Sequence, residues 1–101
     1  MEKSVKFSML LEIYGKLLTE RQADIVDLYY NQNLSLSEIA DDSDVSRQAI
    51  RKSLLEAEKN LFDYEEKLGF LEKQVSREGK IEELLKLIDD EKIISLIDEL
   101  R

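Results

Sequence analysis

Cysteine, histidine, proline and tryptophan are all absent from this chain of 101 residues. Without cysteine or histidine it cannot form disulfides, zinc sites with thiolate or imidazole ligands, or catalytic sites that use a Cys or His nucleophile or a His acid–base group. The absence of proline, together with only three glycines, predicts an all-α chain. No apolar run is long enough to cross a bilayer and no signal-peptide pattern is visible, so we expect a cytoplasmic protein.

The charge balance argues against general affinity for nucleic acid. Charged residues make up 38% of the chain and its net charge is −8, so the protein as a whole repels a polyanion. Residues 46–59 are an exception, because four cations there outnumber two acids. We therefore expect DNA binding that is weak and salt-sensitive, or a partner that is protein or RNA.

Residues 34–62 carry the most specific pattern, which is typical of a helix-turn-helix. Ser35 and Glu38 form an S-x-x-E capping box that predicts a helix starting at Leu36. The run from Asp41 to Asp44 consists of turn-forming residues that end this helix, and Asp44 can adopt the left-handed conformation. Ser46 is a good N-cap for a second helix.

The start of that second helix is the candidate nucleic-acid-binding site. Its exposed positions are expected to be Arg47, Gln48, Arg51 and Lys52, side chains that donate hydrogen bonds to phosphates and base edges. A solvated helix face is the alternative interpretation of these four residues. Ser46 is expected to act mainly as the cap, although its hydroxyl could also contact a phosphate.

Apolar residues continue along the same helix with the alternating spacing of a heptad repeat. The spacing predicts one helix from Ser46 to about Arg77, roughly 45 Å long at about 1.5 Å per residue. Its apolar seam would need a long cover, either the folded-back tail or a second chain. We predict a homodimer whose coiled interface is formed by Leu54, Leu61, Tyr64, Leu68, Leu71 and Val75.

The rest of the chain is organised around this segment. A stripe from Phe7 to Leu17 predicts a first helix that ends at a left-handed Gly15, and Thr19 with Gln22 predicts a second capping box. In the tail, Gly79 is expected to break the chain, and Asp89 with Asp90 to separate two short amphipathic helices. We expect a helix-turn-helix domain over residues 1–62 and a helical dimerisation extension over residues 63–101.

Metal, cofactor and catalytic sites are not expected. The acids from Asp41 to Asp44 lack the Gly and Glu of an EF-hand loop, and Asp89, Asp90 and Glu91 fit a helix stop and cap. Tyr29 and Tyr30 fit core packing better than base stacking. Because no glycine-rich phosphate loop is present either, we expect no cofactor and no enzymatic activity.

The quoted segments resemble a known family. LLTERQADIVDLYY, LSLSEIA and VSRQAI resemble region 4 of sigma-70-type factors, which reads the −35 promoter element. YGKLLTERQ at residues 14–22 and FDYEEKLGFLEK at residues 62–73 are similar to the YlxM/p13-like (UPF0122) helix-turn-helix proteins of bacteria. The resemblance implies a region-4-like DNA-binding fold, a dimer, and a role in or regulation of the signal recognition particle pathway. The polar turn at Ser43 and Asp44, and fewer arginines after Ile50, depart from strong promoter readers.

Two functional hypotheses follow. The first is a dimeric DNA-binding regulator whose two recognition helices enter successive major grooves. The alternative is an acidic helical adaptor that binds a protein or RNA component of the signal recognition particle, which the net charge favours. A helix-turn-helix does not by itself establish DNA binding, so the sequence leaves both open.

Overall fold

Residues 1–101 are described by a computed structural model, and they form helices and no strand. The elements, in chain order, are α1 (Lys3–Tyr14), the 3-10 turn η1 (Gly15–Leu17), α2 (Glu20–Val26), the π turn η2 (Asp27–Asn31), α3 (Leu36–Ser43), α4 (Arg47–Leu68), α5 (Phe70–Leu87) and α6 (Glu91–Glu99). They divide into two units, Met1–Gly69 and Phe70–Arg101. The division lies after Gly69, whereas the sequence predicted it after Phe62.

Capping explains where α2 begins. The Thr19 hydroxyl accepts the Gln22 backbone N–H (3.1 Å), and the Gln22 side chain accepts the Thr19 N–H (3.3 Å), which confirms the predicted capping box. The helix then widens into η2, where the Asp27 carboxylate accepts hydrogen bonds from the side chains of Asn31 and Gln32.

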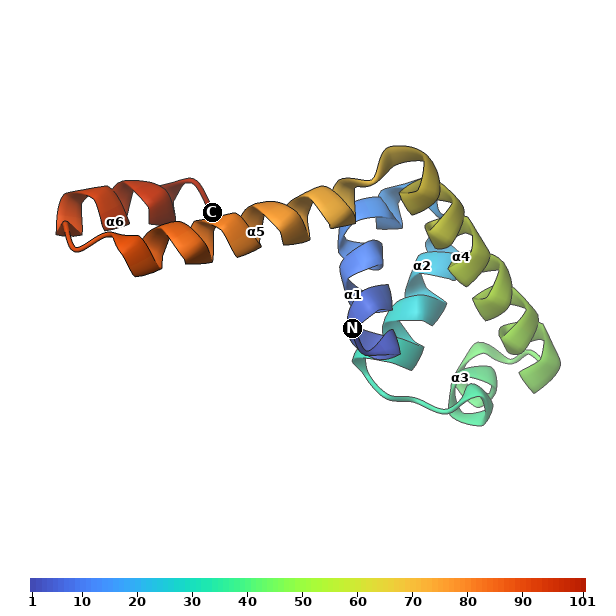
Figure 1. The fold of residues 1–101 in the computed structure, drawn as a ribbon. Coiled ribbons are helices and arrows are strands. Elements are labelled where there is room, and N and C mark those ends of the chain that lie inside the picture. Colours follow the sequence, from blue (N-terminus) through green and yellow to red (C-terminus); the bar gives the residue numbers. More distant parts are fainter. The chain divides into compact units, whose positions relative to one another are not determined.

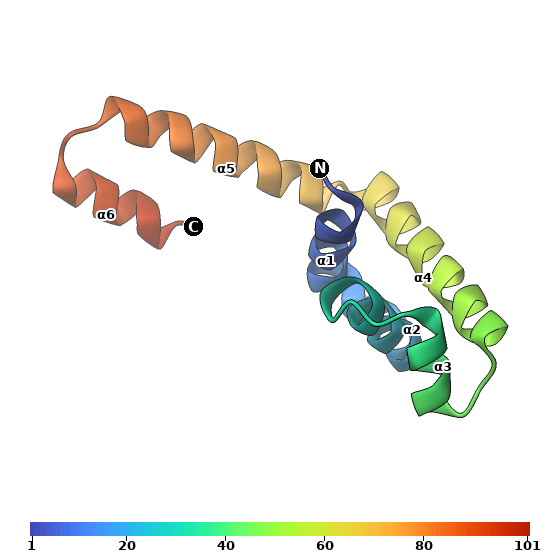
Figure 2. The ribbon, with the colours of Figure 1, turned by 90° about the horizontal axis from the view of Figure 1, so that it is seen from below.

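The core of the first unit lies where α4 runs beside α1 and α2, with α3 at the N-terminal end of α4 (Figures 1 and 2). On α1 and α4 the buried apolar side chains recur at three- and four-residue spacing, which places them on one face of each helix. The largest fully buried side chains are Tyr14, Phe7, Leu10, Ile39, Ile50, Leu61 and Val26.

One prediction for the first helix is wrong. Gly15 has a φ of −55°, which is right-handed, and it opens the 3-10 turn η1 instead of terminating α1 in a left-handed conformation. A 3-10 turn has about three residues per turn, so it changes which side chains face inward. Leu18 is therefore buried, whereas Leu17, which the stripe assigned to the core, is exposed.

The predicted single helix from Ser46 to about Arg77 is also wrong. Helix α4 ends at Leu68, and Gly69 takes the left-handed conformation (φ 64°, ψ 25°) with its N–H bonded to the Glu65 carbonyl at 2.8 Å. Glycine adopts this conformation without the steric cost that a Cβ brings. The chain then starts a separate helix at Phe70.

Much of the predicted dimer seam is used inside the chain. Leu54 and Leu61 are buried on α4, within the core formed with the helices that precede it. Tyr64 is half-buried, its ring centroid lies 5.9 Å from that of Tyr14, and its hydroxyl donates to the Leu17 carbonyl at 3.2 Å. Their assignment to an interface with a second chain is therefore corrected, because the first three helices already cover this part of the seam.

The other three predicted seam residues lie on both sides of Gly69. Leu68 ends α4 and is exposed, and Val75 on α5 is exposed as well. Leu71 is buried. The heptad spacing thus crosses a break in the helix, so Leu71 and Val75 do not extend the stripe of α4.

The second unit is a helical hairpin in which α6 returns alongside α5 (Figures 1 and 2). Gly79 lies inside α5, so the predicted break there is wrong. The predicted separation at Asp89 and Asp90 is confirmed: the Asp90 carboxylate accepts the N–H groups of Lys92 (2.8 Å) and Ile93 (3.2 Å) and caps α6. No helix of the chain combines the length and the apolar character needed to span a bilayer.

Candidate nucleic-acid interface

The first helix of the helix-turn-helix is fixed by a reciprocal cap. The Ser35 hydroxyl accepts the Glu38 N–H, and the Glu38 carboxylate accepts the Ser35 N–H, both at 3.1 Å. This confirms the predicted capping box and the start of α3 at Leu36. Ile39 and Ala40 are buried on the inner side of this short helix, so the cap and the core together hold its direction.

The turn between the two helices depends on one residue. Asp44 has a φ of 55° and a ψ of 37°, the left-handed conformation, and its N–H bonds back to the Ala40 carbonyl. Asp tolerates this conformation better than most residues other than glycine. The expectation that the run from Asp41 to Asp44 ends the helix is wrong for its first three residues, because α3 continues through Ser43; the left-handed turn at Asp44 is confirmed.

The second helix starts where the sequence predicts. The Ser46 hydroxyl oxygen accepts the Ala49 N–H at 3.1 Å, and α4 begins at Arg47. Ile50 is fully buried and anchors the first turns of α4 to the core. The hydroxyl hydrogen of Ser46 stays free to donate, so the residue can serve as a cap and contact a phosphate at the same time.

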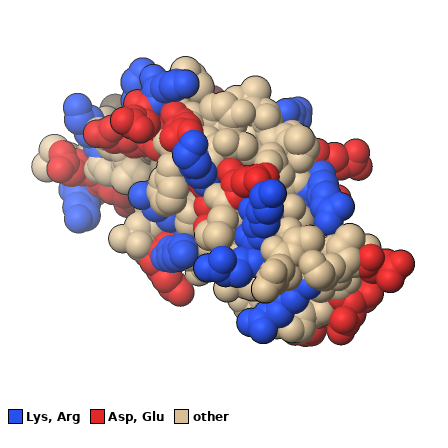
Figure 3. Space-filling view, turned by 90° about the vertical axis from the view of Figure 1, so that its right-hand side faces the viewer, with Lys and Arg blue, Asp and Glu red and all other residues tan.

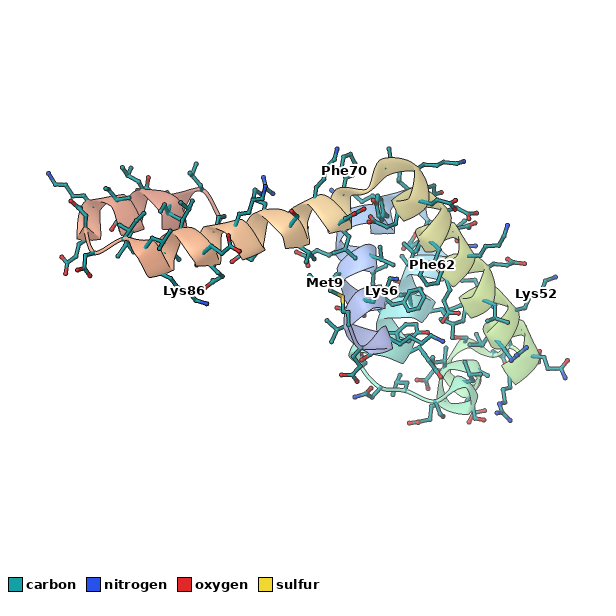
Figure 4. The ribbon with its side chains drawn as sticks, in the orientation of Figure 1. Lys6, Met9, Lys52, Phe62, Phe70 and Lys86 are labelled. Atoms are coloured by element: carbon teal, nitrogen blue, oxygen red, sulfur yellow. The ribbon has the colours of Figure 1, made fainter.

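The four predicted donors gather on the outer side of this helix start. Arg47, Gln48, Arg51 and Lys52 are all exposed, and none of the three cations forms an ion pair within the chain. In Figure 4 the Lys52 side chain extends outward from α4, away from the core. A shallow depression on this surface is lined by Ser46, Gln48, Ala49, Arg51, Lys52, Leu55, Glu56 and Lys59.

The charge on this outer side is more positive than the sequence suggests, because Glu58 does not contribute to it. Glu58 is buried, accepts a hydrogen bond from the Tyr30 hydroxyl and lies 3.9 Å from the Lys3 ammonium. Burial, together with the hydrogen bond to Glu58 and its negative charge, raises the pKa of the Tyr30 hydroxyl above its ordinary value, so the phenol stays neutral. Glu56 is then the one exposed acid between Ser46 and Lys59.

Figure 3 looks onto this side of the molecule. Lys and Arg side chains cross the middle of the face with one group of Asp or Glu atoms among them, and further Asp and Glu side chains lie towards its margins. The acids that precede α4, Asp41 and Asp42 at the end of α3 and Asp44 in the turn, are exposed. An approaching polyanion therefore meets attraction over a limited area and repulsion around it.

Two exposed apolar side chains on α4 were missed by the sequence analysis. Leu55 is 46% exposed beside the cations, and Phe62 is 42% exposed seven residues later. The Lys6 ammonium lies 5.0 Å from the centroid of the Phe62 ring, and the two side chains point toward one another in Figure 4. The sequence analysis followed the heptad positions, which lie on one side of the helix. Leu55 and Phe62 lie outside that pattern, so the pattern did not indicate them.

A helix start with this geometry can approach a major groove. The groove is about 12 Å wide and admits one α-helix, whose first turns then lie nearest the base edges. Arg47 and Arg51 can donate two parallel hydrogen bonds to guanine, and Gln48 can pair with adenine. Lys52 lies four residues after Gln48 and one after Arg51, so it is farther from the helix start. Lysine side chains commonly contact phosphates.

Comparisons with known proteins identify relatives along nearly the whole chain. A family model described as "Putative helix-turn-helix protein, YlxM / p13 like" (UPF0122) matches residues 1–100. A UPF0122 protein of Clostridium perfringens (strain 13 / Type A) is 44% identical over 105 residues, covering 98% of this chain and 93% of the relative. A UPF0122 protein of Shouchella clausii is 39% identical over 104 residues, covering 99% of this chain and 95% of the relative. These matches confirm the resemblance indicated by the motifs and the all-α helix-turn-helix fold.

Proposed function

Because the chain belongs to the UPF0122 family of helix-turn-helix proteins, we propose that it binds duplex DNA and regulates transcription. The binding residues are Ser46, Arg47, Gln48, Arg51 and Lys52. The genes of the signal recognition particle pathway are the targets to which the family resemblance points.

The observation that carries this proposal is the set of unpaired cations at the start of a capped and anchored helix. Arg47, Arg51 and Lys52 have no internal carboxylate partner, so no ion pair has to break before they contact DNA. The Ser46 cap and the buried Ile50 fix the direction of the helix start. Such preorganisation reduces the entropy that binding would otherwise cost.

Net charge determines the strength and salt dependence of this binding. With a chain at −8, non-specific attraction to DNA is small, and affinity depends on the few cations of the recognition surface. Each of Arg47, Arg51 and Lys52 that neutralises a phosphate should add about −0.9 to the slope of log affinity against log salt, so the slope reaches about −3 per chain if all three contact phosphates. Two copies bound to one DNA site would double this slope.

The test is a DNA selection followed by a comparison of variants. Random duplexes are selected with the purified protein, and the enriched sequence is measured by fluorescence anisotropy over a salt series. Arg51→Ala should weaken binding by about 1 to 3 kcal/mol, or roughly 5- to 160-fold, if Arg51 reads guanine. Arg21→Ala removes an exposed arginine of α2 and is the matched control, with unchanged affinity expected.

A further expectation concerns the shape of the site. If two copies bind together, the enriched sequence should contain inverted half-sites about 34 Å apart or a multiple of it. No enriched sequence, or equal affinities of the wild type and Arg51→Ala, would overturn the assignment of α4 as a DNA-reading helix.

The second candidate function is an acidic adaptor that binds a basic protein or a ribonucleoprotein of the signal recognition particle. The net charge of −8 and the exposed acids next to the recognition surface favour it. Glu83→Lys is a suitable test, because Glu83 is exposed on α5 and forms no internal ion pair, unlike Glu82, which is bonded to Arg101. Under this function Glu83→Lys weakens partner binding and Arg51→Ala has little effect, the reverse of the result expected for DNA.

A further inference from the structure

Leu55 and Phe62 form a short apolar stripe on the outer side of α4. Phe62 comes seven residues after Leu55, and seven residues make almost two helical turns, so the two side chains lie on the same side, about 10 Å apart along the helix. Leu55 is 46% and Phe62 is 42% exposed. The Phe62 ring packs edge-on against the buried Phe7 ring, with the centroids 5.0 Å apart, so its position is fixed by the core. The stripe is therefore an ordered apolar surface that nothing within the chain covers.

Lysine side chains surround this stripe. Lys52 lies three residues before Leu55 and Lys59 four residues after it, spacings that make side chains neighbours on a helix surface. Lys6 of α1 reaches the other end, where its ammonium lies 5.0 Å from the centroid of the Phe62 ring. Lys6 and Lys52 form no ion pair within the chain. Positive charge and exposed apolar surface thus lie side by side in a chain whose net charge is −8.

Acidic side chains limit the width of this positive surface. Glu56 and Asp63 each come one residue after an apolar residue of the stripe, a rotation of about 100° that places both along one flank. Glu66 is exposed four residues after Phe62 and closes the far end. The Asp63 carboxylate lies 3.8 Å from the Lys59 ammonium, an exposed ion pair of the kind that contributes little to stability and can exchange partners. The positive surface is therefore about as wide as one helix.

We propose that this stripe, formed by Leu55 and Phe62 with Lys6 and Lys59 beside them, binds an acidic amphipathic helix of a partner protein. Apolar side chains of that helix, seven residues apart, cover Leu55 and Phe62, and its carboxylates pair with the two lysines. Recognition of an amphipathic helix uses apolar anchors at this spacing. The stripe includes none of the residues assigned to DNA, so the proposal does not rest on the proposed DNA binding.

Charge and width together select this occupant. A basic partner would be repelled by the lysines. A broad anionic surface, such as a membrane or a second DNA duplex, would have to face Glu56 and Glu66 as well as the lysines, and the net charge of −8 adds to that repulsion. A single acidic helix contacts the lysines and the apolar pair and leaves the neighbouring acids in water.

Selection of peptides from a random library is the first test. Bacteriophages that display peptides of about 16 residues, enough for roughly four helical turns, are selected on the full-length protein. The enriched peptides should be acidic and carry apolar residues at three- and four-residue spacing. The most enriched peptide is then synthesised with a fluorescent label, and its dissociation constant is measured by anisotropy. The absence of enriched peptides, or the enrichment of peptides that are not acidic, overturns the proposal.

Matched variants show where the selected peptide binds. Leu55→Ala should raise the dissociation constant about tenfold because an apolar anchor is lost, and Lys59→Glu should raise it by about tenfold or more because carboxylates then face each other. Leu17→Ala and Lys67→Glu make the same changes at exposed residues outside the stripe and should leave the dissociation constant unchanged. Circular dichroism of each variant checks that the fold is retained. Equal affinities of the wild type and Leu55→Ala overturn the proposal.

Other occupants of the stripe give different results in related assays. If DNA covers it, Leu55→Ala weakens binding of the enriched duplex and leaves peptide binding unchanged. If a second copy covers it, the wild type is a dimer in sedimentation equilibrium and Leu55→Ala is a monomer. If a membrane covers it, vesicles of phosphatidylglycerol retain the wild type and release Leu55→Ala. Each of these results overturns the proposal. Arg47→Ala should weaken binding of the duplex alone, which separates a failure of the DNA assignment from a failure of this one.

Discussion

Leu61→Ala is the sharpest test of where the apolar stripe of α4 is buried. Leu61 has no exposed surface and lies in the core of the first unit. Replacing a fully buried leucine by alanine costs about 3 to 5 kcal/mol, because transfer free energy is lost and a cavity remains. A unit of this size is stable by only about 3 to 10 kcal/mol. The change should therefore remove a large part of the stability of the first unit.

Tyrosine fluorescence is the suitable signal for this measurement. All four tyrosines lie between Tyr14 and Tyr64, so they report on the first unit and not on the hairpin. With a denaturant slope of about 1.5 kcal/mol per molar urea, the midpoint should fall by about 2 M or more. Ile50→Val is a milder change at another fully buried position, expected to cost about 0.5 to 1.5 kcal/mol, and it keeps the test usable if Leu61→Ala does not fold.

Leu55→Ala, on an exposed side of the same helix, is the control and should change stability by no more than about 0.5 kcal/mol. The loss for Leu61→Ala should be the same at two protein concentrations a hundredfold apart, because its contacts lie within one chain. A loss below about 1 kcal/mol, or one that depends on protein concentration, would refute the burial of Leu61 inside the monomer.

Three further predictions concern single interactions. Tyr30→Phe should cost about 1 to 3 kcal/mol, because the buried Glu58 carboxylate loses a hydrogen-bond donor; urea unfolding that matches the wild type would contradict it. Because the pKa of Tyr30 is raised in the fold, the stability that its hydroxyl contributes is complete below the ordinary tyrosine pKa of about 10 and is lost as pH rises above that value. The thermal unfolding midpoint of the wild type should therefore fall more steeply between about pH 9 and 11 than the midpoint of Tyr30→Phe. Gly69→Ala should destabilise by about 1 to 2 kcal/mol through its left-handed backbone alone, since no atom lies within 4 Å of the added Cβ, and Gly69→Asn should cost less in the same thermal scans. Ser35→Ala should cost about 0.5 to 2 kcal/mol by removing one half of a capping box, and an unchanged midpoint would show that Glu38 holds the helix start by itself.

The starts of the helices could be predicted from sequence because their hydrogen bonds are local. Thr19, Ser35 and Ser46 each accept from an N–H group three residues later, and all three caps are present in the structure. The left-handed turn at Asp44 is likewise a local feature, which the residue type itself allows. The four exposed donors of the candidate DNA site follow from these starts, since the cap and the buried Ile50 together fix which side of α4 faces outward.

The ends of the helices could not be predicted in this way, and the glycines show why. Gly15 and Gly79 were expected to interrupt the chain, yet each continues a right-handed helical turn, and Gly69 is the glycine that turns left-handed. Glycine lowers the cost of a left-handed turn without requiring one. Whether the turn forms depends on where packing against other helices ceases to favour the continuing helix.

The sequence by itself determined an all-α chain, a capped helix-turn-helix and an apolar stripe on α4, because composition, local caps and helical periodicity act within a few residues. Only the tertiary structure decided what covers that stripe. Periodicity indicates that a face will be buried but carries no information about what buries it. The position of Leu61 in the sequence was therefore equally compatible with burial by a second chain and with burial inside its own chain. The helices that precede α4 cover the stripe inside the monomer, and exposed apolar side chains remain at Leu55 and Phe62 and on the α5–α6 hairpin.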